Sequence, residues 1–390
     1  MQTGGYQMDF DRIIERRHTE SIKWKYFPED VLPLWVADMD FLSPPEVIEA
    51  LHQRVDHGIF GYGIPPQDLS EIVVNYISRH FHWAPLPSQV SYIPGVVTGF
   101  NLAIRAFCEP GTSVLFHTPA YPPFFGAPKS AKLPFVTNSL LRGTDGAYSI
   151  DFERFEEQII AERVSVFILC NPQNPTGRVF TREELTRLAE ICLRHKVIII
   201  SDEIHCDIVY DGRQHIPIAS LDAEVANSTL TLMAPSKTYN IAGLYASVAV
   251  TSSPELARKF SEVKNGLISG PDLLALTAAR AAYLYGDGWL QGVLGYLQAN
   301  RDWLSEAIAR DFPGMRMCKP EGTFLAWLDC RGLNLPLEPQ KFFQDRARVG
   351  LNSGADYGSE GLGFVRLNFG TQRAVLQEAL ERMTNALNSL

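Results

Sequence analysis

The chain has 390 residues, which is more than one compact core usually holds, so we expect two domains. Hydrophobic residues make up 46% of the chain and charged residues 20%, which is typical of a folded globular protein and excludes a disordered or fibrous one. The formal net charge is −9 and no basic stripe is visible, a balance that disfavours nucleic-acid binding.

The sequence carries no recognisable signal for export, membrane insertion or metal binding. The N-terminus has neither the positive nor the apolar stretch of a secretory signal, and the longest apolar runs are far too short to cross a bilayer. No two of the six cysteines have the spacing Cys-x-x-Cys. We therefore expect a cytoplasmic protein with reduced, mostly buried thiols, no metal site and no membrane partner.

The first forty or so residues contain prolines and no alternation of strand and helix. Within them, the cluster Glu15-Arg16-Arg17-His18 is expected to form the solvated end of a helix. The middle of the chain then alternates short apolar runs with helical patterns, which predicts an α/β architecture around a largely parallel sheet. The expected strands lie at 113–117, 164–170, 197–201, 229–233 and 247–251.

A helix is predicted to begin after Thr181, because Thr181-x-x-Glu184 fits a capping box and apolar residues follow at helical spacing. From about Gly286 the pattern changes to a long helix over 289–309, strand-like segments at 323–329 and 364–368, and a last helix near the C-terminus. This pattern predicts a second, α+β domain, with which the first forty residues can pack.

Candidate functional residues follow three of the predicted strands, where open α/β sheets bind ligands. Lys237 lies in Ala234-Pro235-Ser236-Lys237-Thr238, directly after the strand at 229–233. Burial there lowers the pKa of a lysine, and a neutral amine can form a Schiff base with an aldehyde. Ser236 supplies a hydroxyl suited to a phosphate oxygen. By itself, however, the segment favours a surface lysine in a loop.

Asp202 follows the strongly apolar strand at 197–201, so its carboxylate is expected at the edge of the sheet and partly desolvated. A protonated pyridine nitrogen would be a suitable partner, because the ion pair keeps the ring an electron acceptor. His205 is placed to hydrogen-bond another polar group of the same ligand. The alternative is an Asp and a His that cap the next turn.

Asn174 lies in Asn171-Pro172-Gln173-Asn174-Pro175-Thr176-Gly177, after the strand at 164–170. Two Asn-Pro pairs within five residues predict a rigid turn, which suits an amide that holds one oxygen of a ligand. A single Asn-Pro pair would indicate an ordinary turn.

Together, in this order, the three segments resemble the fold-type I pyridoxal 5′-phosphate (PLP) enzymes of the aspartate aminotransferase superfamily. Asp202 follows Asn174 by 28 residues, and Lys237 follows Asp202 by 35. The sequence WVADMDF at 35–41, and a histidine at position 205 where aminotransferases carry tyrosine, resemble the branch of cystathionine β-lyases, or C–S lyases, of the MalY/PatB type. The resemblance extends from Phe10 to the end of the chain.

The resemblance implies a homodimer with shared active sites. It also implies a large PLP-binding domain over 46–288, with a mostly parallel seven-stranded sheet between helices. A smaller α+β domain would then be built from residues 1–45 and 289–390.

The resemblance also implies roles for particular residues around the PLP ring. Lys237 would hold PLP as a Schiff base and move the Cα proton, while Asp202 would pair with the pyridine nitrogen. Asn174 and His205 would contact the O3′ side of the ring. Tyr121, in Pro119-Ala120-Tyr121-Pro122, would stack on the ring face; a core aromatic beside a proline turn is the alternative.

At the phosphate, the resemblance implies the backbone N–H groups of Val96 and Val97, where a helix begins, and the hydroxyl of Ser236. Tyr62, in Gly61-Tyr62-Gly63, would reach the phosphate of the neighbouring subunit. Many aminotransferases carry a second basic residue eight positions after the lysine, where this chain has Tyr245. The phosphate therefore has one charged partner fewer than in those enzymes.

For the substrate, the resemblance implies that Arg366, within 364–368, binds the α-carboxylate, because a bidentate guanidinium fits that group. Val36, Ala37 and Asn174 complete the expected substrate site. A salt bridge at a strand edge is the alternative for Arg366.

The implied function is a PLP-dependent C–S β-lyase that cleaves cystathionine or other cysteine S-conjugates by α,β-elimination to a thiol, such as homocysteine, with pyruvate and ammonia. The alternative is a PLP-dependent class I/II aminotransferase with the same residues. A PLP protein with a regulatory binding role is a third hypothesis, which the presence of Lys237, Asp202 and Arg366 disfavours. A Rossmann dehydrogenase is excluded, because no Gly-x-Gly-x-x-Gly follows a predicted strand.

Overall fold

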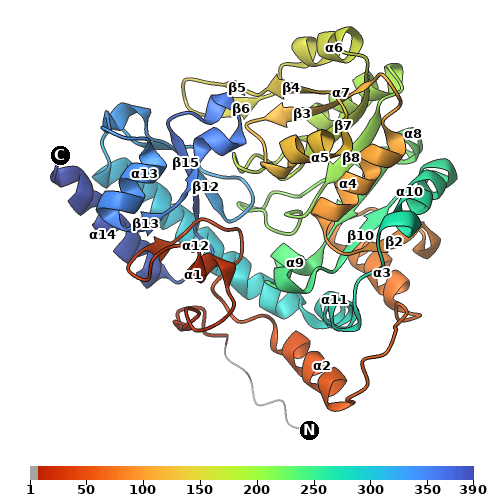
Figure 1. Cartoon of the computed structure of the whole chain (residues 1–390), viewed down its shortest axis with the longest axis horizontal. Coiled ribbons are helices and arrows are strands. Elements are labelled where there is room, and N and C mark those ends of the chain that lie inside the picture. The colour runs from red at the N-terminus through yellow and green to blue at the C-terminus, as the bar shows by residue number, and fades with distance from the viewer. Residues whose placement is uncertain (1–7) are drawn as a thin grey trace.

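The computed structural model describes residues 8–390, and a seven-stranded sheet runs through the larger part of the molecule (Figure 1). The strand order is β2-β10-β9-β8-β7-β3-β4, in which β10 is antiparallel to both neighbours and the pairs from β9 to β4 are parallel. The predicted α/β architecture with a mostly parallel seven-stranded sheet is therefore confirmed. The strands are β2 (Val90–Ile93), β3 (Ser113–Thr118), β4 (Phe135–Ser139), β7 (Val164–Cys170), β8 (Ile198–Asp202), β9 (Thr229–Met233) and β10 (Ser247–Val250).

The inner strands are buried on both faces, as the Val- and Ile-rich sequence of β8 predicts for that strand. Every residue of β3 and β9 is buried, and so are the last four residues of β8. β7 and β9 have the predicted bounds, whereas β8 begins and ends one residue later than expected. Asp202 is consequently the last residue of β8, at the carboxyl edge of the sheet.

Helices cover both faces of this sheet. α4, α5 and α10 pack around Phe100 on one face, and α6, α7 and α8 pack around Phe155 on the other. The predicted capping box begins α7: the Glu184 amide donates to the Thr181 hydroxyl, and the Thr181 amide donates to the Glu184 carboxylate. These helices are α4 (Val96–Phe107), α5 (Pro123–Ala131), α6 (Phe152–Ala161), α7 (Arg182–Arg194), α8 (Ala223–Asn227) and α10 (Pro254–Leu267).

The C-terminal part of the chain forms an α+β unit around a four-stranded antiparallel sheet of order β11-β12-β15-β14. The long helix predicted over 289–309 extends two residues further at each end, and the strand expected at 323–329 begins at 325, after Thr323 with its positive φ of 67°. Its elements are α12 (Asp287–Asp311), β11 (Arg316–Met317), β12 (Leu325–Asp329), α13 (Pro339–Phe342), β14 (Asn352–Ser353), β15 (Phe364–Asn368) and α14 (Arg373–Asn388).

The N-terminal part of the chain lies against this C-terminal unit. β1 (Leu32–Pro33) pairs in parallel with β13 (Val349–Gly350), and the Asn368 amide donates to the Leu34 carbonyl oxygen at 2.9 Å. Residues 1–7, with which the expected segment 1–45 begins, lie outside the described part of the chain. The division into 1–45, 46–288 and 289–390 stays a prediction.

Five further helices and a two-stranded ribbon complete the architecture. α11 packs on α2 and α3 beside the larger sheet. The elements are α1 (Ile22–Lys25), α2 (Pro45–Asp56), α3 (Leu69–Phe81), α9 (Pro235–Thr238), α11 (Leu273–Tyr285), β5 (Leu141–Arg142) and β6 (Tyr148–Ser149). All six cysteines are free thiols, and four of them are buried, as predicted. Over residues 8–390, no helix combines the length and apolarity that a membrane span needs.

The expectation of a solvated helix end at 15–18 is wrong. These residues lie outside the helices, and the side chain of Arg16 is only 21% exposed. Its guanidinium forms ion pairs with Asp38 at 2.7 Å and with Asp40 at 2.6 Å. The cluster looked solvated because its carboxylate partners lie 22 and 24 residues further along the chain.

Candidate active site

A cavity of about 930 Å³ lies at the carboxyl edge of the larger sheet, where the N-terminal segment approaches it. This volume is within the range of cofactor and small-molecule sites. The cavity brings together most of the predicted site residues: Val36, Ala37, Val96, Val97, Tyr121, Asn174, Asp202, His205, Ser236 and Lys237. Arg366 lies at its border, where it contacts Asn174.

Lys237 lies in α9, which begins two residues after β9 ends. Its Nζ donates a hydrogen bond to the Ala37 carbonyl oxygen at 2.6 Å. Burial lowers the pKa of Lys237 to about 8; the charge of Arg366 acts in the same direction, while Asp38 and Asp202 oppose it. The amine is therefore much closer to its neutral, nucleophilic form at physiological pH than an ordinary lysine.

Asp202 is 4% exposed at the end of β8. Burial raises its pKa to about 7, although its Oδ1 accepts a hydrogen bond from the Ile204 amide at 3.2 Å. A cationic partner, such as a protonated ring nitrogen, would stabilise the charged form of this buried carboxylate.

His205 is buried nearby, and its Nδ1 has no hydrogen-bond partner among the described residues. Burial holds the pKa of His205 well below the usual value. It is consequently a neutral imidazole near pH 7.

The opposite end of the cavity is a helix N-terminus. Gly95 precedes α4 with φ 99°, a conformation that favours glycine, and no side chain caps the first turn. Gly95, Val96 and Val97 line the cavity together with Ser236, so free backbone N–H groups and a hydroxyl are available to an anion. Tyr245 lies against Gly95, since a Cβ added to the glycine would be 3.4 Å from its ring.

Tyr62 is fully exposed and does not line this chain's cavity. Tyr121 does line it, and burial raises the pKa of its phenol, so the ring is neutral near pH 7. The structure therefore brings Tyr121 into the site and leaves Tyr62 at the surface, where only a second subunit could use it.

Arg366 is a buried cation, 3% exposed, whose contacts are to neutral groups. It donates to the Asn174 side-chain oxygen at 3.1 Å, to the Trp35 carbonyl oxygen at 2.8 Å and to the Asn352 side-chain oxygen at 2.7 Å. Its Nε is buried without a partner, and its guanidinium lies over the Tyr357 ring at 5.2 Å. Among the described residues no carboxylate pairs with it, so the positive charge is available to an anionic ligand.

Asp38, Asn240 and Asn352 are among the polar residues of the site that were not predicted. Asp38 lies within the WVADMDF segment and lines the cavity. Asn240 donates to the carbonyl oxygens of Met39 and Phe41, three residues after Lys237 in sequence. Asp38 could have been suspected from its place in the motif, but no local pattern indicates the two asparagines.

The arrangement fits the cofactor that the sequence resemblance implies. A desolvated amine suits an aldehyde, and the buried carboxylate of Asp202 suits a pyridinium nitrogen. The uncapped start of α4 with Ser236 suits a phosphate, and the unpartnered Nδ1 of His205 is available to a polar ring substituent. In this structure each polar part of PLP therefore has a group of the matching kind available.

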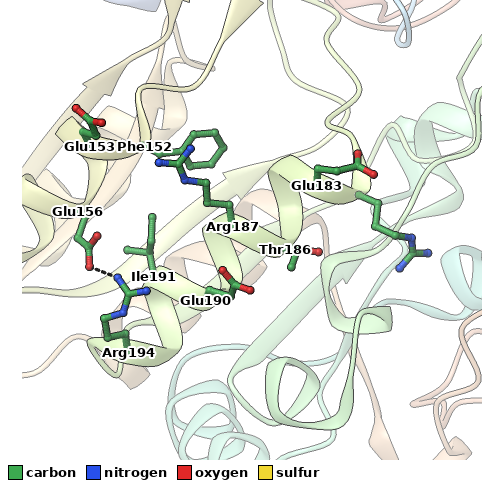
Figure 2. Close-up of a pocket in the computed structure, with 10 residues that line it drawn as sticks. Phe152, Glu153, Glu156, Glu183, Thr186, Arg187, Glu190, Ile191 and Arg194 are labelled. Atoms are coloured by element: carbon green, nitrogen blue, oxygen red, sulfur yellow. Dashed lines mark hydrogen bonds and ion pairs between the residues drawn. The ribbon is translucent and has the colours of Figure 1, made fainter.

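A second hollow of about 600 Å³ lies between α6 and α7 (Figure 2). There Arg194 pairs with Glu156, and the Arg187 guanidinium stacks on the Phe152 ring at 4.4 Å. None of the predicted site residues lines this hollow. Its charged side chains interact with one another at the surface, so the larger cavity is the candidate active site.

Comparison with known proteins agrees with this geometry. A profile of the family described as aminotransferase class I and II matches residues 29–383. The chain is 41% identical to cystathionine beta-lyase PatB of Bacillus subtilis (strain 168), over 98% of this chain and 100% of that protein. It is similar to the crystal structure of OvoB, with 43% identity and a TM-score of 0.93 over 98% of this chain and 100% of that one. It is also similar to the PLP-containing cystalysin of Treponema denticola, with 31% identity and a TM-score of 0.94 over 98% and 99% of the two chains.

Proposed function

The chain belongs to the aminotransferase class I and II family, and we propose that it is a PLP-dependent C–S β-lyase acting on cystathionine or other cysteine S-conjugates. The products are a thiol, pyruvate and ammonia, and the thiol is homocysteine when the substrate is cystathionine. One observation carries the proposal: the site pairs the desolvated amine of Lys237 with the buried guanidinium of Arg366, which has no carboxylate partner in the described residues. The first group suits an aldehyde and a moving proton, and the second suits the carboxylate of an amino acid.

When bound, PLP withdraws electrons from the substrate Cα and makes its proton acidic. Lys237 would hold the cofactor in the resting enzyme, and its free amine would accept the Cα proton of the substrate. A lysine with a pKa of about 8 is effective in this role near neutral pH, where it can both accept and return a proton. The Asp202 carboxylate keeps the ring nitrogen protonated.

Other residues hold the cofactor in place. The amides of Val96 and Val97 and the hydroxyl of Ser236 bind the phosphate, which the dipole of α4 favours. Tyr121 would cover one face of the ring, and Asn174 and His205 would contact the ring oxygen.

The substrate is oriented by its α-carboxylate, which Arg366 binds beside Asn174. Val36 and Ala37 form the neighbouring wall of the cavity. After the Cα proton has moved to Lys237, the electron pair left at Cα forms a Cα=Cβ double bond, while the Cβ–S bond breaks and its electron pair leaves with the sulfur as a thiolate. The thiolate then takes up a proton to become the free thiol. The released enamine rearranges to an imine, which water hydrolyses to pyruvate and ammonia.

The lyase is favoured over an aminotransferase by the segment 35–41 and by His205, both of which border Lys237 in the cavity. The match to the relative named cystathionine beta-lyase PatB covers 98% of this chain and the whole of that protein. An aminotransferase would use the same residues but return the proton to the cofactor instead of losing sulfur from Cβ.

We also propose that the enzyme is a cytoplasmic homodimer in which Tyr62 reaches the phosphate of the partner subunit. Ile59, Phe60, Tyr62 and Ile64 are all exposed in one segment without regular structure, which is unfavourable unless another surface covers them. The cytoplasmic location is supported by the six free thiols.

The test is an incubation of the purified holoenzyme with L-cystathionine, without a keto acid, that follows free thiol and pyruvate together. We expect both products in equal amounts, and neither of them with Lys237→Ala. If neither forms with the wild-type enzyme, and an amino donor is converted only when a keto acid is added, the protein is an aminotransferase instead.

A further inference from the structure

The segment 35–41 touches both of the residues that the proposed reaction depends on. The Trp35 carbonyl oxygen accepts from Arg366 at 2.8 Å, and two residues later the Ala37 carbonyl oxygen accepts from Lys237 at 2.6 Å. Asp38 follows directly and lines the same cavity. Apart from bends, the segment has no regular secondary structure, so side-chain contacts contribute to where these acceptors lie.

Two acidic side chains tie the segment to the N-terminal part of the chain. Arg16 bridges Asp38 at 2.7 Å and Asp40 at 2.6 Å, and also donates to the Met39 carbonyl oxygen. Lys23 is completely buried, and it pairs with Asp40 at 2.6 Å and donates to the Asp38 carbonyl oxygen at 3.2 Å. A buried ion pair of this kind imposes a specific geometry, since each charge loses its partner if the segment moves.

Asn240 holds the other side of the segment. Its side-chain nitrogen donates to the Met39 and Phe41 carbonyl oxygens at 3.0 and 2.7 Å, and its side-chain oxygen accepts from the Met39 amide at 3.0 Å. Because Asn240 follows Lys237 by three residues, the lysine and the segment are held at a set distance from each other.

Several charged groups face Lys237, and they come from different elements. Asp38 comes from the segment 35–41, Asp202 from the end of β8 and Arg366 from β15. His205, Tyr121 and Cys170 also line the cavity, but burial leaves each of them uncharged near pH 7. Further out, the cavity is lined by Arg16, Asp40 and Glu20.

Asp38 differs from Asp202 in that its charge has no role in the proposed binding of the cofactor. Its Oδ2 accepts from Arg16, whereas its Oδ1 is buried without a hydrogen bond from the described residues and lies 3.7 Å from the Lys23 ammonium. Arg16 and Lys23 therefore neutralise part of the negative charge of Asp38, and Lys237 is affected only by the part that is left.

We propose that Asp38 is a positioning residue for Lys237: held by Arg16 and Lys23, it places the Ala37 carbonyl oxygen on the lysine amine and supplies a partly compensated negative charge beside it. This inference rests on the proposed function, in which Lys237 carries the cofactor. In this proposal, the WVADMDF segment adjusts how tightly the nitrogen of Lys237 holds its proton.

The charge balance gives opposite signs for two substitutions. Asp38→Asn keeps the size of the side chain, removes the negative charge and leaves Asp40 as the carboxylate that pairs with both Arg16 and Lys23. The nitrogen of Lys237 therefore holds its proton less tightly. Arg16→Met removes the compensating charge, so the same nitrogen holds its proton more tightly. Loss of structure alone would not produce shifts of opposite sign.

The experiment is a pH titration of the visible absorbance of the cofactor attached to Lys237, in holoenzyme of the wild type and each variant. Asp38→Asn is expected to move the midpoint to lower pH and Arg16→Met to higher pH, each by about 0.5 pH unit or more. Arg17→Met is the matched control: it makes the same charge change in the same segment, but its guanidinium lies over the Trp24 ring rather than on the acidic pair.

If Arg16→Met does not fold, the direction in which Asp38→Asn shifts the titration midpoint is enough to test the proposal. An unchanged or raised midpoint with Asp38→Asn overturns it, and so do shifts of equal sign in the two variants. In the proposed function, the wild-type protein has a visible absorbance band of the bound cofactor, and Lys237→Ala abolishes this band. If the wild-type protein has no such band, the proposed function itself fails.

Discussion

Replacing Asp202 with asparagine should stabilise the cofactor-free protein at alkaline pH while removing its activity. Asp202 is 4% exposed, and burial raises its pKa from 3.8 to about 7. Its negative charge is therefore unfavourable in the folded chain until a cationic ring nitrogen is present. A residue retained at a cost to stability is expected where a ligand supplies the missing partner.

The magnitude follows from the linkage between proton binding and folding. A group whose pKa is raised on folding adds stability that is complete below its unfolded pKa and is lost as the pH rises through its folded pKa. A difference of about three pH units corresponds to a loss of about 4 kcal/mol, an upper value, by pH 8. At pH 5 only about 2 kcal/mol has been lost. Asparagine carries no charge, so the advantage of Asp202→Asn should grow between these two pH values.

The assay is thermal unfolding of the cofactor-free wild type and Asp202→Asn at pH 5 and pH 8. Asp329→Asn is a control of opposite sign: burial works to raise the pKa of Asp329, but hydrogen bonds from Arg331 and the charges of Arg331 and Arg142 outweigh it and lower the pKa. That variant should lose stability at pH 8. With cofactor, Asp202→Asn should form pyruvate at least about 100-fold more slowly, as when one preorganised electrostatic contact is removed. If it is less stable than the wild type at pH 8, or gains equally at both pH values, the reasoning is refuted.

Three further predictions test other parts of the structure. Arg366→Lys keeps the charge but loses the bidentate fork, so kcat/KM for cystathionine should fall by about 10- to 100-fold, the worth of a charged hydrogen bond. Arg331→Lys, at a side chain that is 56% exposed and does not line the cavity, should leave kcat/KM unchanged. Lys23→Met removes one partner of the buried Asp40 and should lower the unfolding free energy by up to about 3 kcal/mol, less than for a pair with no other partner because Arg16 remains; an unchanged thermal midpoint would contradict the burial of this pair. Tyr62→Ala should retain less cofactor absorbance after dialysis than the wild type, and equal retention would argue against a contact across the subunits.

The sequence by itself determined the architecture of the larger sheet and most of the site. Short apolar runs between turn residues predicted β7 and β9 with their correct bounds, because strands inside a parallel sheet are covered on both faces and are mostly apolar. Asn174, Asp202 and Lys237 were recognised because each follows a strand, and parallel strands bring their carboxyl ends to one edge. Their positions after strands, together with the resemblance of the three segments to a known family, were enough to expect these residues in one site, and all three line the same cavity.

Only the tertiary structure decided how these groups are partnered. Lys237 meets the carbonyl oxygen of a residue 200 positions away, and Arg366 meets one 331 positions away. Arg16 looked like part of a solvated cluster until the fold placed Asp38 and Asp40 beside it. Local sequence patterns show which faces of a strand or helix are apolar. The burial that shifts a pKa, and the neighbouring charges that oppose the shift, depend on segments that only folding brings together, so no local pattern reveals them.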